Sequence, residues 1–230
     1  VGTTTMTDGA VTLNVKVTSA ANRTLTLGTE TSTYANAIVG GQTATGCIDL
    51  SKPILLAGET DSWSITKVGK YAFYNNKAVT FPDAGLDLRD VEVIDERAFT
   101  FCLGVRKVLV SEALTTISSL AFASCSNLTA FEPMFPDSLT TINGLAFAPT
   151  YTGVGGNAAP KLEGTVSLKG LTSLGRAAFR GNTAITDVLL GAGLSTIATQ
   201  DYRYEDSRLD MGGGVFDTCK KWRADYRYAD

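Results

Sequence analysis

Residues 114–128 read Leu-Thr-Thr-Ile-Ser-Ser-Leu-Ala-Phe-Ala-Ser-Cys-Ser-Asn-Leu, and this phrase decides the fold. Its core, Leu-x-x-Ile-x-x-x-Ala-Phe, returns with conservative changes along the chain, so the sequence contains an internal repeat. The basic unit is about 23 residues long, and the later units carry insertions. A unit of this size cannot bury its apolar face alone, so successive units must stack and share one core. The six copies are marked by Phe73, Phe99, Phe122, Phe147, Phe179 and Phe216.

Two further positions keep the register of the repeat. The third residue after each phenylalanine is a small polar or thiol side chain in a position that we expect to face inward. These residues are Asn76, Cys102, Cys125, Thr150, Asn182 and Cys219. The sixth residue after the phenylalanine is apolar in every copy except the fourth, which has Gly153. The apolar residues are Val79, Val105, Leu128, Ile185 and Trp222.

The local pattern is typical of strands rather than helices. Residues 105–110 and 185–190 are short, apolar-rich stretches flanked by turn residues, whereas no window keeps a helical period over ten or more residues. The sequence therefore predicts a β-rich solenoid of about six coils, with at most a single helical turn around each Ala-Phe pair. Parallel strands of successive coils should lie about 4.8 Å apart.

The cysteines are explained mostly by the register. Cys102, Cys125 and Cys219 occupy the same inward position of different coils. A spacing of about 4.8 Å between stacked side chains slightly exceeds the Cβ separation of a disulfide, about 3.5–4.5 Å, so we predict free thiols. Cys47 lies outside the register, and the repeat does not explain it.

The chain divides at about residue 62, because residues 1–62 contain no Ala-Phe phrase. Residues 11–17 alternate in polarity and residues 24–27 follow after a turn, which predicts a β-hairpin, with a second β pair near residues 48–56. We interpret 1–62 as a β cap over the open end of the solenoid or, alternatively, as a small β module with its own ligand. Residues 63–230 form the solenoid, with insertions near 151–160 and 198–213.

The composition excludes several classes of function. The chain has 230 residues, 44% of them hydrophobic, and a formal net charge of −3, which argues against a nucleic-acid-binding protein. The absence of histidine excludes Ser-His-Asp and Cys-His catalysis and HExxH zinc sites. No run of 18 apolar residues predicts a transmembrane segment in this chain. The glycine-rich stretch 153–157 lacks the Lys-Ser/Thr of a phosphate loop, and no EF-hand spacing is present, so we expect neither cofactor nor metal.

The phrase at 114–128, with its Ala-Phe-x-x-Cys core, resembles the repeat of BspA-like leucine-rich-repeat proteins, a family of bacterial surface and secreted proteins. The resemblance covers about residues 63–223, and the sequence departs from it at Thr150 and at the two insertions. The resemblance implies a leucine-rich-repeat fold, a location outside the cell or on its outer surface, no catalysis and, in some members, adhesion to host matrix proteins or other cells. The given chain begins at Val1 without an export signal, so the expected location rests on the resemblance alone.

The candidate binding site comes from two similar segments. The sequence Asp-Tyr-Arg-Tyr at residues 201–204 is repeated at residues 225–228, with a tryptophan shortly before the second copy. Exposed tyrosine, tryptophan and arginine side chains suit stacking on sugars or anchoring of a protein partner. In the alternative interpretation, the tryptophan fills the apolar position of the last coil and the tyrosines form a carboxyl-terminal cap. The candidate residues are Tyr202, Arg203, Tyr204, Trp222, Tyr226, Arg227 and Tyr228.

Three functions remain open from the sequence. The leading hypothesis is a non-enzymatic surface or secreted protein that binds a host matrix protein or a polysaccharide, because the repeat scaffold carries no reactive constellation. The second is an extracellular enzyme acting on polysaccharide, which would need two carboxylates about 5–9.5 Å apart in one groove. The third is a structural spacer that holds another domain away from the cell surface.

Overall fold

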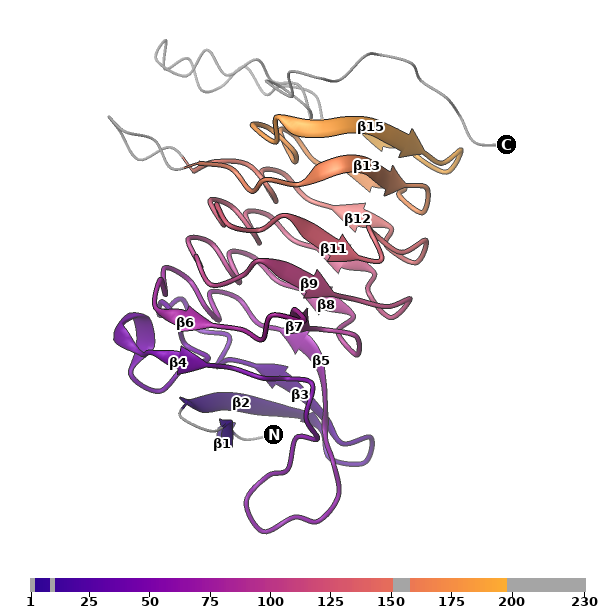
Figure 1. Cartoon of the computed structure of the whole chain (residues 1–230). Coiled ribbons are helices and arrows are strands. Elements are labelled where there is room, and N and C mark those ends of the chain that lie inside the picture. Colours follow the sequence, from indigo (N-terminus) through magenta and orange to yellow (C-terminus); the bar gives the residue numbers. More distant parts are fainter. Residues whose placement is uncertain (1–2, 9–10, 151–157, 198–230) are drawn as a thin grey trace.

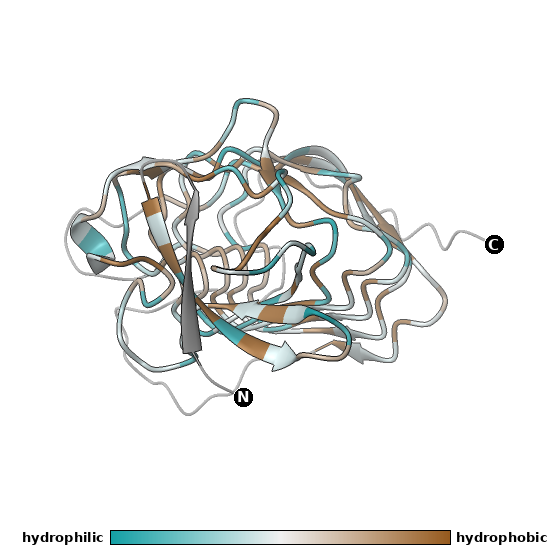
Figure 2. Ribbon diagram, turned by 90° about the horizontal axis from the view of Figure 1, so that it is seen from below, coloured by the Kyte–Doolittle hydropathy of each residue, from teal (hydrophilic) through white to brown (hydrophobic). Residues whose placement is uncertain are grey.

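The computed structural model describes residues 3–8, 11–150 and 158–197, and they form a β-solenoid. The coils stack along one axis, from the amino-terminal hairpin to β15 (Figure 1). Seen from the amino-terminal end, successive coils lie almost over one another (Figure 2). The predicted β-rich solenoid is therefore confirmed. Five coils that carry a phenylalanine of the repeat lie in the described residues, and the sixth, at Phe216, lies outside them.

One face of the solenoid is a nine-stranded sheet. From β3 onward its strands are parallel and each coil contributes one, because the chain returns to the same face after every turn. β1, β2 and β3 pair antiparallel, so the predicted hairpin is confirmed. In spatial order the strands are β1 (Thr3–Asp8), β2 (Val11–Ser19), β3 (Thr24–Leu27), β5 (Ser64–Val68), β8 (Val93–Ile94), β10 (Thr116–Ile117), β12 (Thr141–Ile142), β14 (Ser173–Leu174) and β16 (Thr196–Ile197).

Shorter parallel sheets form a second face, and the strands predicted at 105–110 and 185–190 are present there as β9 and β15. The second β pair expected near 48–56 is wrong, because Ile48 donates its N–H to Thr80 of the next coil and Ile54 forms only an isolated bridge with Trp63. In the part of the chain that the structure describes, the one helical element is the 3₁₀ turn Gly41–Thr43. The strands of this face are β4 (Gly46–Cys47) with β6 (Val79–Thr80); β7 (Leu86–Asp87), β9 (Lys107–Leu109) and β11 (Ala130–Glu132); and β13 (Glu163–Leu168) with β15 (Ala184–Leu190).

The core is organised by a column of phenylalanine rings. The rings of adjacent coils are nearly parallel, with interplanar angles of 3–12° and centroids 5.0–5.6 Å apart. All five are fully buried. The rings stack because each coil places its phenylalanine at the same corner and successive coils are one strand spacing apart. The column consists of Phe73, Phe99, Phe122, Phe147 and Phe179.

The polar position three residues after the phenylalanine satisfies backbone groups at the same corner. Asn182 donates to the carbonyl oxygens of Phe147 and Phe179, at 2.8 and 3.0 Å, and Cys125 donates its S–H to the carbonyl oxygen of Phe99 at 2.9 Å. Burial raises the pKa of the Cys102 thiol to about 12. Cys102 and Cys125 are free, as predicted, and fully buried.

The fourth copy keeps the apolar position in another way. Nine extra residues separate Phe147 from Leu162, whose side chain is fully buried, and Lys161 donates its N–H to the carbonyl oxygen of Leu128 in the preceding coil. Leu162 therefore fills the position that the simple count assigned to Gly153. An insertion at this corner leaves the stacking intact because the chain re-enters the register before the next strand.

A coil without phenylalanine precedes the recognised copies. Ala37 donates its N–H to the carbonyl oxygen of Ala72, in the same way as Phe73 donates to Ala98 in the next coil. Leu27 pairs with Val68 in the parallel register of the main sheet. Residues 24–47 are thus one more turn of the solenoid, in which alanine replaces phenylalanine.

The amino-terminal hairpin packs on this first turn. Leu13 and Val15 are fully buried and belong to the same core as the repeat coils. This packing supports our proposal of an amino-terminal cap, since a separate module would have a core of its own. Within the range 1–62, however, residues 24–47 are a turn of the solenoid and not part of the cap.

Candidate functional site

The seven candidate residues from the sequence, Tyr202, Arg203, Tyr204, Trp222, Tyr226, Arg227 and Tyr228, lie outside the residues that the structure describes, as does Cys219. Their role as a binding site stays a prediction. The described residues present a different aromatic surface.

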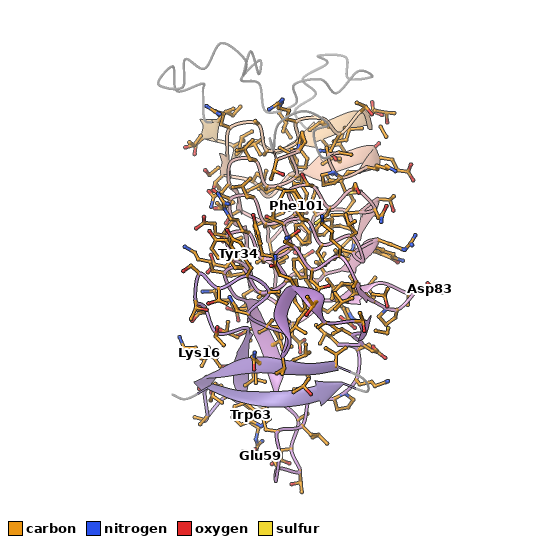
Figure 3. All side chains as sticks on the ribbon, turned by 90° about the vertical axis from the view of Figure 1, so that its left-hand side faces the viewer. Lys16, Tyr34, Glu59, Trp63, Asp83 and Phe101 are labelled. Carbon is orange, nitrogen blue, oxygen red and sulfur yellow. The ribbon has the colours of Figure 1, made fainter. Side chains whose placement is uncertain are left out.

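This surface, which we call the tyrosine cluster, consists of Tyr34, Tyr71, Tyr74 and Phe101. The ring centroids of Tyr34 lie 5.6 Å from Tyr71 and 4.2 Å from Tyr74, and Tyr71 and Tyr74 are 5.3 Å apart. Phe101 meets Tyr74 edge-on at 5.9 Å. Tyr34 is 49% exposed, and Figure 3 shows Tyr34 and Phe101 on the same face of the solenoid.

The repeat itself directs two of these rings outward. In Tyr71-Ala72-Phe73-Tyr74 the central pair is fully buried, whereas the flanking tyrosines are half-buried. Tyr71 has a left-handed backbone with φ of 57°, and the residue before the alanine has a similar φ in every later described coil. This conformation costs about 1–2 kcal/mol in a residue other than glycine, so core packing must hold it. The corner therefore fixes the backbone at this position in each coil, and the side chain there is partly exposed in all of them except at the buried Ala177.

Asn36 holds the loop that presents Tyr34. Its side-chain N–H₂ donates to the carbonyl oxygens of Thr31, Thr33 and Lys70, at 2.9, 3.1 and 2.7 Å. Its Oδ1 accepts from the N–H of Thr29 at 2.9 Å. Asn36 is 6% exposed, so these bonds are largely shielded from water. One amide thus ties the Tyr34 loop to the residue directly before Tyr71.

Arg97 borders the tyrosine cluster. Its guanidinium carbon lies 5.8 Å from the centroid of the Tyr71 ring, within the range of a cation–π contact. Burial, followed by the influence of Tyr34, raises the pKa of Tyr74, so its hydroxyl stays protonated at neutral pH. The cluster therefore combines apolar ring area, neutral hydroxyl groups and a cation.

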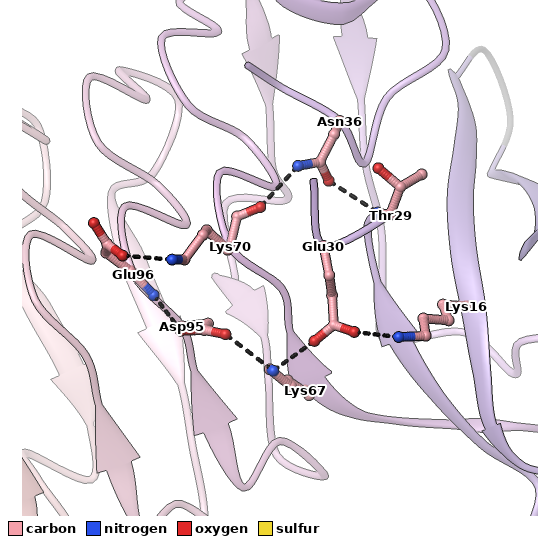
Figure 4. A network of polar contacts seen from close by, with 8 residues as sticks. All are labelled: Lys16, Thr29, Glu30, Asn36, Lys67, Lys70, Asp95 and Glu96. Atoms are coloured by element: carbon pink, nitrogen blue, oxygen red, sulfur yellow. Dashed lines mark hydrogen bonds and ion pairs between the residues drawn. The ribbon is translucent and has the colours of Figure 1, made fainter. Parts of the chain in front are cut away.

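An ion-pair network anchors the base of the cluster (Figure 4). The Nζ of Lys67 lies 2.5 Å from Glu30 and 2.9 Å from Asp95, and Glu30 also pairs with Lys16 at 2.6 Å. Hydrogen bonds from Lys16 and then Lys67 lower the pKa of Glu30. Lys70 pairs with Glu96 at 2.7 Å. The network connects the hairpin, the first turn and the next two coils, so the cluster rests on a cross-linked base.

The tyrosine cluster was missed at the sequence level because only the invariant positions of the repeat were compared. Around the alanine–phenylalanine pair, the first copy has tyrosine where the second has Arg97 and Thr100. A comparison of these variable positions across the copies would have singled out Tyr71 and Tyr74. Tyr34 gives no such signal, since its coil lacks the repeat phrase.

Two carboxyl groups of the described residues, those of Asp87 and Asp49, have a lowered pKa. The side chains of Asp87 and Arg89 form a bidentate pair, and hydrogen bonds from Arg89 lower the pKa of Asp87. The pKa of Asp49 is also lowered, chiefly by a hydrogen bond from Ser51. A general acid of a glycosidase needs a raised pKa. No group of three or more potential metal ligands occurs among the residues that are described.

The repeats of this chain match the model of a known protein family. A family model described as BspA type leucine rich repeat region matches residues 60–152 in six copies. A solved leucine rich cell surface protein from Faecalibacterium prausnitzii A2-165 is similar, with 20% sequence identity and a TM-score of 0.44. The match covers 83% of this chain but only 55% of that protein. No curated protein matches. Over the described ranges, no helix is long and apolar enough to cross a membrane.

Proposed function

We propose that this chain, whose repeats are leucine-rich repeats of the BspA type, is a non-enzymatic binding protein of the cell exterior that holds a protein partner through the tyrosine cluster. The family supports a surface location and protein binding. The observation that carries the proposal is the packing of Tyr34, Tyr71, Tyr74 and Phe101 into one partly exposed aromatic patch beside Arg97.

The composition of the patch favours a protein partner. Tyrosine and arginine are enriched among the residues that dominate protein–protein affinity, because they bury large area with few rotatable bonds. The Tyr34 ring is held by the loop anchored at Asn36, so little side-chain freedom is lost on binding. The patch is thus pre-organised.

The experiment is a solid-phase binding screen of the purified chain against matrix proteins, with a Tyr34→Ala variant. Tyr34 contacts the other rings but does not belong to the buried core, so the variant should fold, with a melting temperature lowered by a few degrees at most. We expect its affinity to fall by about 2 kcal/mol, roughly 30-fold, as for an exposed aromatic anchor.

Leu55→Ala is the matched control, because Leu55 is 51% exposed but lies outside the tyrosine cluster. A variant with Tyr202, Tyr204, Tyr226 and Tyr228 changed to alanine tests the surface predicted from the sequence. Loss of binding in that variant, with Tyr34→Ala unaffected, would place recognition at the terminal segments instead. Failure of the folded chain to bind any protein would leave the spacer hypothesis ahead.

A further inference from the structure

A concavity lies at the amino-terminal end, formed by a loop that leaves the regular coil. Residues 48–63 make this loop, and it is closed by the backbone hydrogen bond from Trp63 to Ile54, at 2.8 Å. The indole N–H of Trp63 donates to Oε2 of Glu59 at 3.0 Å, and Figure 3 shows both side chains at this end of the molecule. These contacts fix the shape of the loop without a ligand.

Between this loop and the next coils lies a groove of about 530 Å³, which we call the Trp63 groove. It is lined by residues 50–54, 62–65 and 87–91 together with Ser111. The volume falls within the range of small-molecule sites, about 300–1,000 Å³.

The lining of the Trp63 groove is amphipathic. Ile54, Trp63 and Ile65 form its apolar floor, each less than 9% exposed, and Pro53 adds an exposed apolar edge. Serine side chains, among them the exposed Ser62, contribute hydroxyl groups. A pyranose ring has the matching character, with an apolar C–H face and hydroxyl groups around its edge. Apolar walls with a few placed polar groups are what such a site requires.

Both cations of the Trp63 groove are paired with a carboxylate. Nζ of Lys52 lies 3.3 Å from Asp49, beside the groove. Nε of Arg89 donates to Oδ1 of Asp87 at 3.0 Å, and its terminal nitrogen donates to Oδ2 at 2.5 Å. Asp90 is the remaining charged residue of the lining, so the groove offers donors and acceptors but does not favour an anionic ligand.

We propose that the Trp63 groove binds a neutral oligosaccharide. Hydroxyl groups of the sugar bond to Ser62, to Asp90 and to N–H groups of Arg89, while an apolar C–H face of the sugar covers the exposed ring of Pro53. This site is distinct from the tyrosine cluster, whose protein partner is a separate proposal.

The test is binding of the purified chain to a glycan array, followed by calorimetric titration with maltotriose, cellotriose and triacetylchitotriose. Ser62→Trp fills the groove from an exposed position, and Asp90→Asn removes a charged acceptor without touching the buried core. We expect loss of binding for Ser62→Trp and about tenfold weaker binding for Asp90→Asn. Ala192→Trp, an equally exposed position in a distant coil, is the control and should bind as the parent does.

Saturable binding of a neutral glycan that is lost in Ser62→Trp and kept in Ala192→Trp supports the proposal. Two results overturn it: the folded chain binds no neutral glycan, or the array shows acidic glycans as the ligands that Ser62→Trp abolishes. Because the glycan titrations use no protein partner, their failure would leave the proposal for the tyrosine cluster standing, and loss of protein binding in Tyr34→Ala would not bear on the Trp63 groove.

Discussion

Removal of the central ring of the phenylalanine column should weaken the solenoid more than any exposed substitution. Phe122 is fully buried and stacks on Phe99 at 5.0 Å and on Phe147 at 5.6 Å, with Phe131 packed edge-on at 5.3 Å. Truncation of a buried phenylalanine to alanine costs about 3–5 kcal/mol. Each aromatic pair adds about 0.5–1.5 kcal/mol beyond buried area, so we expect Phe122→Ala to lose about 5 kcal/mol.

The assay is guanidinium denaturation followed by circular dichroism, with the free energy of unfolding taken from the midpoint and slope. Phe101→Ala is the matched control, because Phe101 is half-buried and its one described ring contact is with Tyr74 at 5.9 Å. We expect this control to lose about 1 kcal/mol. A loss below about 2 kcal/mol for Phe122→Ala, or equal losses for the two variants, would refute the conclusion that the ring column holds the coils together.

Three further predictions follow from the polar and thiol groups. Asn76→Ala should lower the free energy of unfolding by about 3 kcal/mol, because the Asn76 side chain donates to two carbonyl oxygens and accepts from two N–H groups. Asn76→Cys should lower it less, and thermal unfolding of both variants checks this order. The pKa of Glu30 is lowered in the folded chain, so the ionised carboxylate stabilises the fold by about 1 kcal/mol or less. This contribution is present above the unfolded pKa near 4.5 and is lost as the pH falls through the folded value. Glu30→Gln should therefore make the free energy of unfolding depend less on pH below pH 5, as measured by denaturation from pH 7 to 3. Iodoacetamide at pH 8 should modify the exposed Cys47 in the native chain but should modify Cys102 and Cys125 only after unfolding, because burial shields both thiols and raises their pKa. Peptide mapping by mass spectrometry measures the order of modification. Reaction of either buried cysteine before Cys47 would contradict the prediction.

The repeat was predictable because its signal is carried by buried positions. Phe73 and its equivalents, the Asn or Cys three residues later and the apolar residue six residues later each face the same environment in every coil, so packing restricts them in the same way. The coil at 24–47 escaped detection because Ala37 fills the aromatic position and the Tyr34 loop lengthens the corner. Hydrogen-bond register preserves a coil even when its most recognisable side chain is absent.

The candidate surfaces were harder to predict for a physical reason. The tyrosine cluster requires Tyr34, which the Asn36 amide brings against the next coil, and no sequence spacing encodes that bond. The Trp63 groove depends on a loop closed by the bridge to Ile54, again a contact between irregular segments. Both surfaces include an irregular segment of the first 63 residues, the Tyr34 loop or the loop at 48–63, and neither segment contains the repeat phrase.

A regular solenoid requires the same buried residues in every coil, whereas a selective surface requires residues that differ between coils. In this chain the repeated residues lie in the core and the irregular ones at the surface of the amino-terminal coils. Each repeat corner has one residue with a left-handed backbone, and from the second to the fifth copy these residues are Arg97, Leu120, Leu145 and Ala177. Their exposure differs, from half-buried Leu120 and Leu145 to buried Ala177, so the fold fixes the backbone at this corner rather than the side chain. Tyr71 is the aromatic member of this series, and it meets other rings because the loop of the neighbouring turn places Tyr34 beside it. The aromatic surface thus forms where an irregular corner adjoins a regular one, which is the expected relation if the end of the solenoid, rather than its repetitive middle, is where partners are recognised.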